Sequence, residues 1–213
     1  MEKEIVFREF QEKDSQMIEE IIIEAWKYND LCSSKTAHKM AKVFLTSCLT
    51  NQTYTRVALL NNEIIGVIMA KDSKSHKCPF KYKIKQAFAI ISLYLSKEGR
   101  NTSRIFSNVN EIDKELLNKC KKEYEGEVAF FAISSKARGK GIGKKMFNDM
   151  LEYMKSKKIN NFYLYTDTSC NYGFYEHQGM KKCTEKSQNF IIKGKEAEMT
   201  FFIYDYSINK SIK

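Results

Sequence analysis

Three alternate glycines, placed between an apolar segment and an amphipathic helix, constrain the fold of this chain more than any other feature. The loop is Arg138-Gly139-Lys140-Gly141-Ile142-Gly143, and it follows an apolar run from Val128 to Ile133. After the loop, apolar residues recur at helical spacing: Ile142, Met146, Met150 and Met154. Glycine lets the backbone turn tightly because no Cβ obstructs it. The segment therefore predicts a buried strand, a tight turn and a helix packed back on a sheet, as in α/β proteins.

The rest of the chain predicts one mixed sheet with helices on both faces. An alternating segment from Ile5 precedes a helix capped by Asp14 or Ser15, and Ser33-Ser34 caps a second helix running to about Leu49. Strands at 56–60 and 64–70 flank Asn61-Asn62-Glu63, which is typical of a β-hairpin. Later segments predict strands at 128–133 and 162–166, a short helix at 171–177, and extended chain at 180–192 and 198–206. The order is β-α-α-β-β-insertion-β-α-β-α-β-β, with about six to seven strands.

Residues 71–125 are predicted to form a mostly helical insertion within a single domain that spans 1–213. Charge is dense in this segment, and Pro79 and Gly99 interrupt the pattern. A helix over 80–95 carries apolar residues on one side: Phe80, Ile84, Phe88, Ile91 and Leu95. A second helix, over 110–122, turns Ile112, Leu116, Leu117 and Cys120 inward. The apolar side of the first helix predicts packing on the edge of the domain; the alternatives are a lid over a cleft or a contact with a second copy of the chain.

The composition fits a compact domain and excludes several other classes. The chain has 213 residues, of which 43% are hydrophobic, with 1 proline and 9 glycines, so a sizeable core is expected and collagen-like sequences are excluded. The 6 cysteines form no CxxC pair and only 3 histidines occur, so no metal site is expected. The start of the chain is unlike a secretion signal, and its longest apolar stretch is too short to cross a bilayer. We expect a cytoplasmic protein with free thiols and no membrane partner.

The glycine loop is suited to hold phosphate oxygens. Backbone amides at the start of a helix lack partners within it, and the helix dipole adds roughly half a positive charge there. A Walker loop does not fit, because it needs a glycine where Arg138 stands, and the alternate glycines do not match the dinucleotide fingerprint either. A glycine-rich turn without any ligand is the plainer alternative. The formal net charge of +10 is compatible with nucleic acid, an acidic membrane or a phosphorylated ligand. A solvated lysine-rich surface is the commonest outcome, so no nucleic acid is expected as partner.

The spacing Arg-x-x-Gly-x-Gly, from Arg138 to Gly143, resembles that of the GNAT N-acetyltransferase superfamily. The resemblance covers nearly the whole chain outside the insertion, and its specific parts are 127–143 and the later segment 174–180. It implies the GNAT fold and the transfer of an acetyl group from acetyl-CoA to a primary amine. It also implies that the exposed backbone of Phe131, Ala132 and Ile133 pairs with the pantetheine arm like an added strand. The pyrophosphate would be bound by the amides that follow: Arg138, Gly139, Lys140, Gly141, Ile142, Gly143 and Lys144.

The same resemblance implies an acid and a base. An attacking amine must be neutral, and Glu127 resembles the position of the base that removes its proton, directly or through water. Tyr175 looks like the tyrosine that protonates the departing CoA thiolate. The plainer alternatives are that Glu127 is an exposed glutamate at the end of a strand and that Tyr175 is an aromatic residue of the core. A chain of water molecules is a further candidate for the base.

Three residues near the second motif need separate interpretation. The family often has alanine four residues before the tyrosine, whereas this chain has Asn171. Asn171 lies on a predicted polar turn, and we expect it to contact the cofactor. Cys170 is not expected to act as a nucleophile, because direct transfer uses no covalent enzyme intermediate. His177 is interpreted as a residue at the end of a helix.

The sequence leaves the acceptor open among a polyamine, an amino sugar, an amino acid and a protein amine. The resemblance implies that specificity comes from the early helices, including Trp26, Tyr28 and Asn29, and from the insertion. Two functions of other classes are alternatives. A non-catalytic acyl-CoA-binding or sensor domain would keep the glycine loop without depending on Tyr175. A basic RNA-binding module would bind with steep salt dependence. A homodimer is a further expectation.

Overall fold

The strands predicted from the sequence lie in one mixed sheet of seven strands in the computed structural model, which describes residues 4–192 and 195–208. Their order is β1-β2-β3-β4-β5-β7-β6. All neighbouring strands are antiparallel except β4 and β5, which are parallel. β7 lies between β5 and β6, so the last strand does not form the edge. The bounds are β1 Ile5–Arg8, β2 Tyr54–Leu60, β3 Glu63–Asp72, β4 Gly126–Ile133, β5 Asn161–Asp167, β6 Lys181–Ile192 and β7 Lys195–Ser207.

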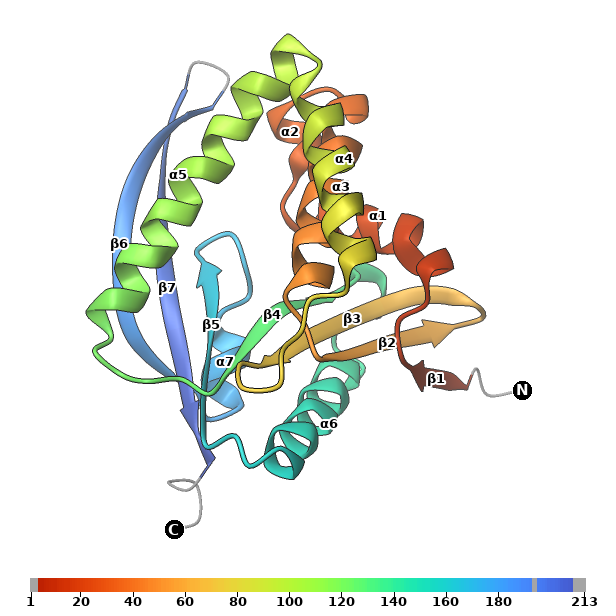
Figure 1. The fold of residues 1–213 in the computed structure, drawn as a ribbon, viewed down its shortest axis with the longest axis vertical. Coiled ribbons are helices and arrows are strands. Elements are labelled where there is room, and N and C mark those ends of the chain that lie inside the picture. Colours follow the sequence, from red (N-terminus) through yellow and green to blue (C-terminus); the bar gives the residue numbers. More distant parts are fainter. Residues whose placement is uncertain (1–3, 193–194, 209–213) are drawn as a thin grey trace.

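Helices cover both faces of this sheet (Figure 1). Their bounds are α1 Ser15–Ala25, α2 Tyr28–Leu31, α3 Ser34–Thr50, α4 Phe80–Tyr94, α5 Lys97–Lys119, α6 Ile142–Ser156 and α7 Gly173–His177, with 3-10 turns at Glu12–Asp14 and Ser135–Ala137. One core cluster joins α1 and α3 to β2 and β3, and a second packs α6 against the opposite face. A third places α5 along β6 and β7. The predicted mixed sheet with helices on both faces is confirmed.

Short-range signals set several of these boundaries. Asn61 and Asn62 have φ angles of 53° and 65°, which is the backbone of a two-residue hairpin turn, so the predicted hairpin is confirmed. The Ser33 hydroxyl accepts a hydrogen bond from the Thr36 amide and caps α3 where the sequence predicts. The predicted stripe of α6 is fully buried: Ile142, Met146, Met150 and Met154.

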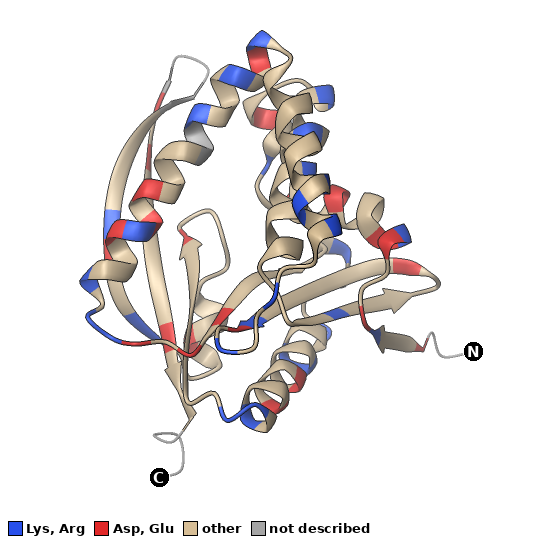
Figure 2. Cartoon of the chain, viewed as in Figure 1, with Lys and Arg blue, Asp and Glu red and all other residues tan. Residues whose placement is uncertain are grey.

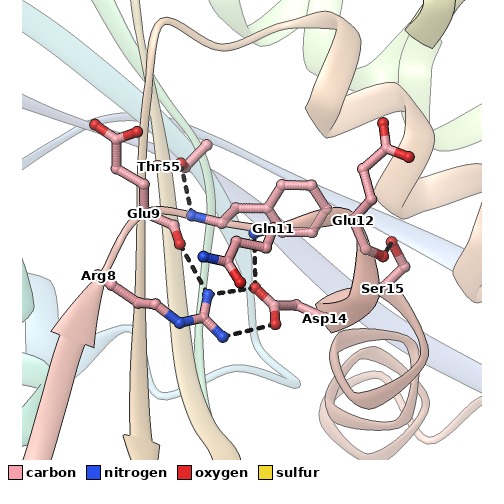
Figure 3. A network of polar contacts seen from close by, with 8 residues as sticks. Arg8, Glu9, Gln11, Glu12, Asp14, Ser15 and Thr55 are labelled. Atoms are coloured by element: carbon pink, nitrogen blue, oxygen red, sulfur yellow. Dashed lines mark hydrogen bonds and ion pairs between the residues drawn. The ribbon is translucent and has the colours of Figure 1, made fainter.

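An ion pair ties the N-terminal strand to the first helix (Figure 3). The Arg8 guanidinium donates to both carboxylate oxygens of Asp14, at 2.6 and 2.8 Å, and the Gln11 amide donates to the same carboxylate at 2.7 Å. The Phe10 amide donates to the Thr55 hydroxyl on β2 at 3.1 Å. Burial alone would raise the pKa of Asp14, but the hydrogen bonds from Arg8 and Gln11 outweigh it and hold this pKa below its usual value. The pair therefore fixes the angle at which the chain leaves β1 and enters α1.

The insertion contains two helices, and its details differ from the sequence prediction. α5 begins at Lys97 rather than at Asn110, because Ser96 caps it by accepting a hydrogen bond from the Gly99 amide at 3.0 Å. Gly99 therefore lies in the first turn of a helix and does not interrupt it. The inward residues of α5 are as predicted, with Ile112, Leu116 and Cys120 buried and Leu117 partly buried.

The expected packing of the apolar side of α4 is wrong. That side is exposed, with 74% of Phe80, 68% of Phe88 and 77% of Leu95 accessible to solvent. The helix instead buries Tyr82, Ala89 and Leu93 and lies beside α3 (Figure 1). On its other flank, Lys81 and Lys85 both pair with Glu12. The small side chain of Ala89 lets α4 approach α3 closely. The helical spacing of the large apolar residues does not indicate this contact.

The two ends of the insertion lie side by side. Asp72, the last residue of β3, pairs with Gly126, the first residue of β4, and the Ser73 amide donates to the Glu125 carbonyl at 2.9 Å. The intervening helices therefore extend from one end of a regular antiparallel pair.

Within the described residues, no helix has both the length and the apolar character that a bilayer span requires.

We expect Asp14→Asn to lower the free energy of unfolding by about 2 kcal/mol at pH 7, because it leaves the Arg8 guanidinium without its carboxylate. The folded-state pKa of Asp14 is depressed, so this stabilisation is present above pH ~4, the unfolded pKa, and is lost as pH falls through the folded value. Urea unfolding at pH 7 and pH 2 measures it. Glu9→Gln, at an exposed neighbouring carboxylate, is the control; equal effects of the two variants would contradict the role of the pair.

Candidate functional site

β4 and β5 separate after a short contact. They pair only at Gly126–Phe162 and Glu127–Tyr163, whereas β4 pairs with β3 as far as Ile133–Gly66. From Val128 to Ile133, β4 therefore has no strand partner on its β5 side in the described part of the chain. Side chains take up part of this backbone, since the Ile133 carbonyl accepts from Arg138 Nε at 3.2 Å and the Ala129 carbonyl from Cys48 Sγ at 3.6 Å. No strand occupies the edge, so it can pair with an extended ligand.

A large cleft opens where the two strands separate. Its volume is about 1310 Å³, and it is lined by the ends of α1, α2 and α3, by α4 and α5, by β4 and β5, and by the start of α6. Such a volume accommodates an extended cofactor together with an acceptor. The insertion therefore forms one wall of the cleft, and the glycine loop opens into it.

The loop presents an open backbone to this cleft. Gly139 and Gly141 have φ angles of 75° and 74°, and a Cβ at either position would meet no atom within 4 Å. The first hydrogen bond of α6 is donated by the Lys145 amide to the Gly141 carbonyl at 3.0 Å, so the three amides before it have no partner within the helix. These amides, together with the positive end of the helix, suit an anion.

A carboxylate of α1 holds the segment that leads into the loop. Glu24 accepts hydrogen bonds from the Ser135 amide at 3.1 Å and from the Ser134 hydroxyl at 3.3 Å. Burial opposes the charge of Glu24, but the Ser135 and Ser134 hydrogen bonds and the nearby Arg138 hold its pKa below the usual range. The loop is thus positioned from the other side of the cleft, and the sequence gives no signal of this contact.

All but one of the site residues predicted from the sequence line the cleft: Glu127, Phe131, Ala132, Ile133, Arg138, Gly139, Gly141, Ile142, Gly143, Lys144, Asn171 and Tyr175. Lys140 is exposed and is absent from the lining. Arg138 uses its Nε to donate to the Ile133 carbonyl at 3.2 Å. The geometry thus brings the predicted positions together, with the exception of Lys140.

Tyr175 lies between the loop and the cleft wall. Its ring packs against Phe174, Phe131 and Tyr204 at centroid distances of 5.6, 6.5 and 6.2 Å. Its hydroxyl makes no hydrogen bond within the described residues, and burial raises the pKa of Tyr175, so the group is protonated at neutral pH. The arrangement can deliver a proton into the cleft.

Glu127 is more constrained than the sequence suggests. It is buried, and its carboxylate forms an ion pair with Lys71 Nζ at 3.0 Å and accepts a hydrogen bond from Asn51 Nδ2 at 3.1 Å. The alternative of an exposed strand-end glutamate is therefore wrong. Lys71 also donates to the Asn51 side chain at 2.8 Å, so the three residues form a closed polar group at the base of the cleft.

Sequence reasoning missed two of the cleft's acidic groups as site residues. Asp113 comes from α5, and Asp167 ends β5, where it accepts hydrogen bonds from the amide and the hydroxyl of Ser169 at 2.7 and 2.5 Å. Burial, with the charges of Asp167 and Glu127, raises the pKa of Asp113 to about 7. No spacing in the sequence indicates that Asp113 lines the same cleft as Asp167 and Glu127, because the position of Asp113 depends on how α5 packs on β6 and β7.

Cys170 and His177 behave as the sequence indicates. Burial and the nearby Asp167 raise the pKa of the Cys170 thiol, so it is a poor nucleophile at neutral pH. His177 is exposed at the end of α7, and its Nδ1 lies 2.6 Å from the Gly173 carbonyl. Of the early residues implicated in specificity, Trp26 and Tyr28 line the cleft.

The model of the family described as "Acetyltransferase (GNAT) family" matches residues 16–180. No curated protein matches the chain. Among solved structures, PH1933 from Pyrococcus horikoshii is 17% identical with a TM-score of 0.60, over 96% of this chain and 98% of that one. A ribosomal-protein-alanine N-acetyltransferase from Brucella melitensis is 12% identical with a TM-score of 0.55, over 95% and 99%. An N-acetyltransferase from Staphylococcus aureus is 12% identical with a TM-score of 0.54, over 96% and 98%. These similarities are similarities of fold.

We expect Asp113→Asn to stabilise the protein at pH 8 by an amount on the order of 1 kcal/mol, because it removes a carboxylate repelled by its neighbours. The folded-state pKa of Asp113, about 7, lies above the unfolded value of ~3.9. Asp113 therefore lowers stability progressively as pH rises from about 4 to about 7, and the two proteins should be equally stable at pH 4. Urea unfolding at both pH values measures this. Glu111→Gln, at an exposed site on the same helix, is the control; a less stable Asp113→Asn at pH 8 would contradict the expectation.

Proposed function

Since this chain belongs to the GNAT family of acetyltransferases, we propose that it transfers the acetyl group of acetyl-CoA directly to a primary amine. Acyl transfer is the general activity that membership of the family supports. One observation carries the finer proposal. The unpaired edge of β4 leads straight into the open amides at the start of α6, and both line one cleft with Tyr175.

The cofactor fits this arrangement by its chemistry. The diphosphate carries negative charge, which suits the amides of Ile142, Gly143 and Lys144 and the positive end of α6. The pantetheine arm has two amides, so it can pair with the free edge of β4 between Val128 and Ile133 as an added strand does. Pairing in this way directs the thioester toward the cleft lining that contains Tyr175.

The reaction then balances as a direct displacement. The lone pair of the neutral amine attacks the thioester carbonyl carbon, a C–N bond forms and the C–S bond breaks. The sulfur leaves with the electron pair and takes a proton from the Tyr175 hydroxyl. The proton lost by the amine nitrogen goes to a base and restores the tyrosine through solvent, so the products are an amide and CoA thiol.

Glu127 is the proposed base, acting on the amine through water. Its ion pair with Lys71 orients the carboxylate. An intervening water molecule in the cleft provides the path from the amine to this carboxylate. Because Cys170 is held as a thiol, a covalent acyl-enzyme is disfavoured.

A titration with acetyl-CoA, using ATP and NAD as controls, is the first test of the cofactor site. We expect Gly141→Asp to weaken acetyl-CoA binding at least about tenfold relative to Gly141→Asn. Both side chains tolerate the left-handed backbone at this position and nearly match in size, so they differ mainly in charge beside the diphosphate. Calorimetry measures both affinities. Equal affinities would remove the loop from the cofactor site.

We expect Tyr175→Phe to lower kcat about a hundredfold while leaving the affinity for acetyl-CoA unchanged, because the variant loses only the proton donor. Tyr172→Phe, on the same turn but outside the cleft lining, is the control. The measurement is CoA release with a panel of amines. An unchanged rate in Tyr175→Phe would assign the proton to another donor. Binding of acetyl-CoA without CoA release for any amine would favour the sensor function instead.

A further inference from the structure

The outer surface of α4 is apolar along the whole length of the helix. Among the described residues, the large hydrophobic side chains that are exposed lie between Phe80 and Leu95, with the exception of Val6. Ile84 and Ile91 are 41% and 55% exposed. Five of these residues form one row at helical spacing, called the α4 row from here on: Phe80, Ile84, Phe88, Ile91 and Leu95. Monomeric soluble proteins rarely leave a continuous apolar surface of this size open to water.

The α4 row occupies a side of the helix that no other part of the site uses. Tyr82, Ala89 and Leu93 are buried, on the side where α4 lies beside α3. Gln86 and Ile90 line the cleft, whereas no residue of the α4 row does. Because each residue of an α-helix turns by about 100°, the row lies opposite the buried residues. A partner can therefore cover the row without displacing α3 or entering the cleft.

The area of the α4 row reaches what a stable dimer needs. At the exposed fractions of its residues, the row presents roughly 600 Å², since a fully exposed aromatic side chain offers about 200 Å² and an aliphatic one somewhat less. Stable protein interfaces bury about 600–1,000 Å² on each partner. Tyr94, which is 49% exposed, and the aliphatic stems of the flanking lysines enlarge the surface further.

The α4 row is complementary to itself when two helices run antiparallel. Its spacings along the chain are 4, 4, 3 and 4 residues, which read nearly the same in both directions. With a two-fold axis near Phe88, Ile84 of one copy faces Ile91 of the other, and Phe80 faces Leu95. Antiparallel helices pack in this way in helix bundles. A two-fold dimer requires such a surface, on which the same patch of both copies meets.

The charges of α4 favour the antiparallel arrangement over the parallel one. Lys81, Lys83 and Lys85 lie in the first half of the helix (Figure 2), and residues 86–96 carry no charge. In a parallel pair, the lysines of the two copies would face one another and repel. In an antiparallel pair, the lysines of each copy lie beside the uncharged half of the other, so like charges are kept apart.

A lipid surface is the less favoured occupant of the α4 row. A helix that lies on an anionic membrane combines an apolar face with free cations beside it. Here Lys81 and Lys85 both pair with the Glu12 carboxylate, at 3.2 and 2.7 Å. Lys83 is thus the lysine of α4 that forms no ion pair with a described residue, and the positive charge that flanks the row is largely neutralised.

We propose that the chain forms a homodimer in which the α4 rows of two copies pack antiparallel across a two-fold axis near Phe88. The dimer buries the row and leaves the cleft of each copy open, because the row and the cleft lie on different sides of α4. It also supports α4, one wall of the cleft, from its outer side. The inference does not depend on the proposed function, since no residue of the row takes part in the proposed chemistry.

The mass of the full chain in solution is the first test. Light scattering during gel filtration should give twice the 24.9 kDa of one chain. Ile84→Lys and Ile91→Glu should each weaken dimerisation at least about tenfold, because each places a charge against the apolar row of the other copy. Val6→Lys, at an apolar residue that is 52% exposed on β1, is the control and should remain dimeric. Circular dichroism checks that the variants, all at exposed positions, stay folded.

Mixing the two variants tests the antiparallel arrangement. In a mixed dimer, the lysine introduced at 84 faces the glutamate introduced at 91, so the mixture should dimerise at concentrations where each variant alone is monomeric. A mixture of Ile84→Lys with Ile91→Lys should stay monomeric. In a parallel pair, position 84 faces position 84, and neither mixture recovers.

Three results would overturn the inference. They are a monomeric unmodified chain at about 100 μM, well above the Kd of a stable dimer, a dimer that Ile84→Lys leaves unchanged, and no recovery in the Ile84→Lys and Ile91→Glu mixture. Sedimentation with vesicles of phosphatidylcholine and phosphatidylglycerol tests the other occupant. Binding of a monomeric chain to these vesicles, lost in Ile84→Lys, would assign the α4 row to a lipid surface instead.

Discussion

The contact between β4 and β5 is the constraint on which the site depends. These strands pair at two positions and then diverge, although each is paired along its length on its other side, β4 with β3 across one bulge and β5 with β7. The sheet therefore remains one unit while it carries an opening at its centre. The free edge of β4, the position of the loop after it and the space between the helices all follow from this separation. A fully paired sheet would satisfy more backbone groups but would leave no place for an extended cofactor.

The opening joins two electrostatic environments within about 1310 Å³. On one side, the start of α6 offers amides and the positive end of a helix. On the other, the carboxylates of Asp113, Glu127 and Asp167 line the cleft, and among the described residues Glu127 is the one of the three that forms an ion pair, with Lys71. An anionic donor and a cationic acceptor can therefore occupy one cleft, each attracted by the part that opposes its charge. The net charge of the whole chain describes neither part, because lysines are spread over helices, strands and loops along the sequence.

The parts of the fold that the sequence predicts are those fixed by neighbouring residues. The Asn61-Asn62 turn, the Ser33 cap and the α6 stripe each depend on residues a few positions apart, and each is confirmed. Two motifs that occur in order along the chain predict the loop residues and Tyr175, and all of these except Lys140 line one cleft, although their roles stay predictions. What could not be predicted depends on distant contacts. The separation of β4 from β5, the Lys71 contact with Glu127 and the approach of Asp113 all join segments far apart in sequence. The exposed side of α4 was mistaken for a packing face because spacing indicates a helix face but not what covers it.

The ends of the insertion have a consequence for how such a protein diversifies. Asp72 and Gly126 are paired neighbours at the end of β3 and β4, so the chain leaves the sheet and returns to it at one point. A short turn could close the same two strands, and lengthening a loop between fixed ends costs free energy that grows only with the logarithm of its length. Helices can therefore be gained, lost or exchanged at this point without altering the register of the strands that carry the glycine loop. The wall of the cleft that the insertion forms and the strands that carry the glycine loop are therefore free to evolve at different rates.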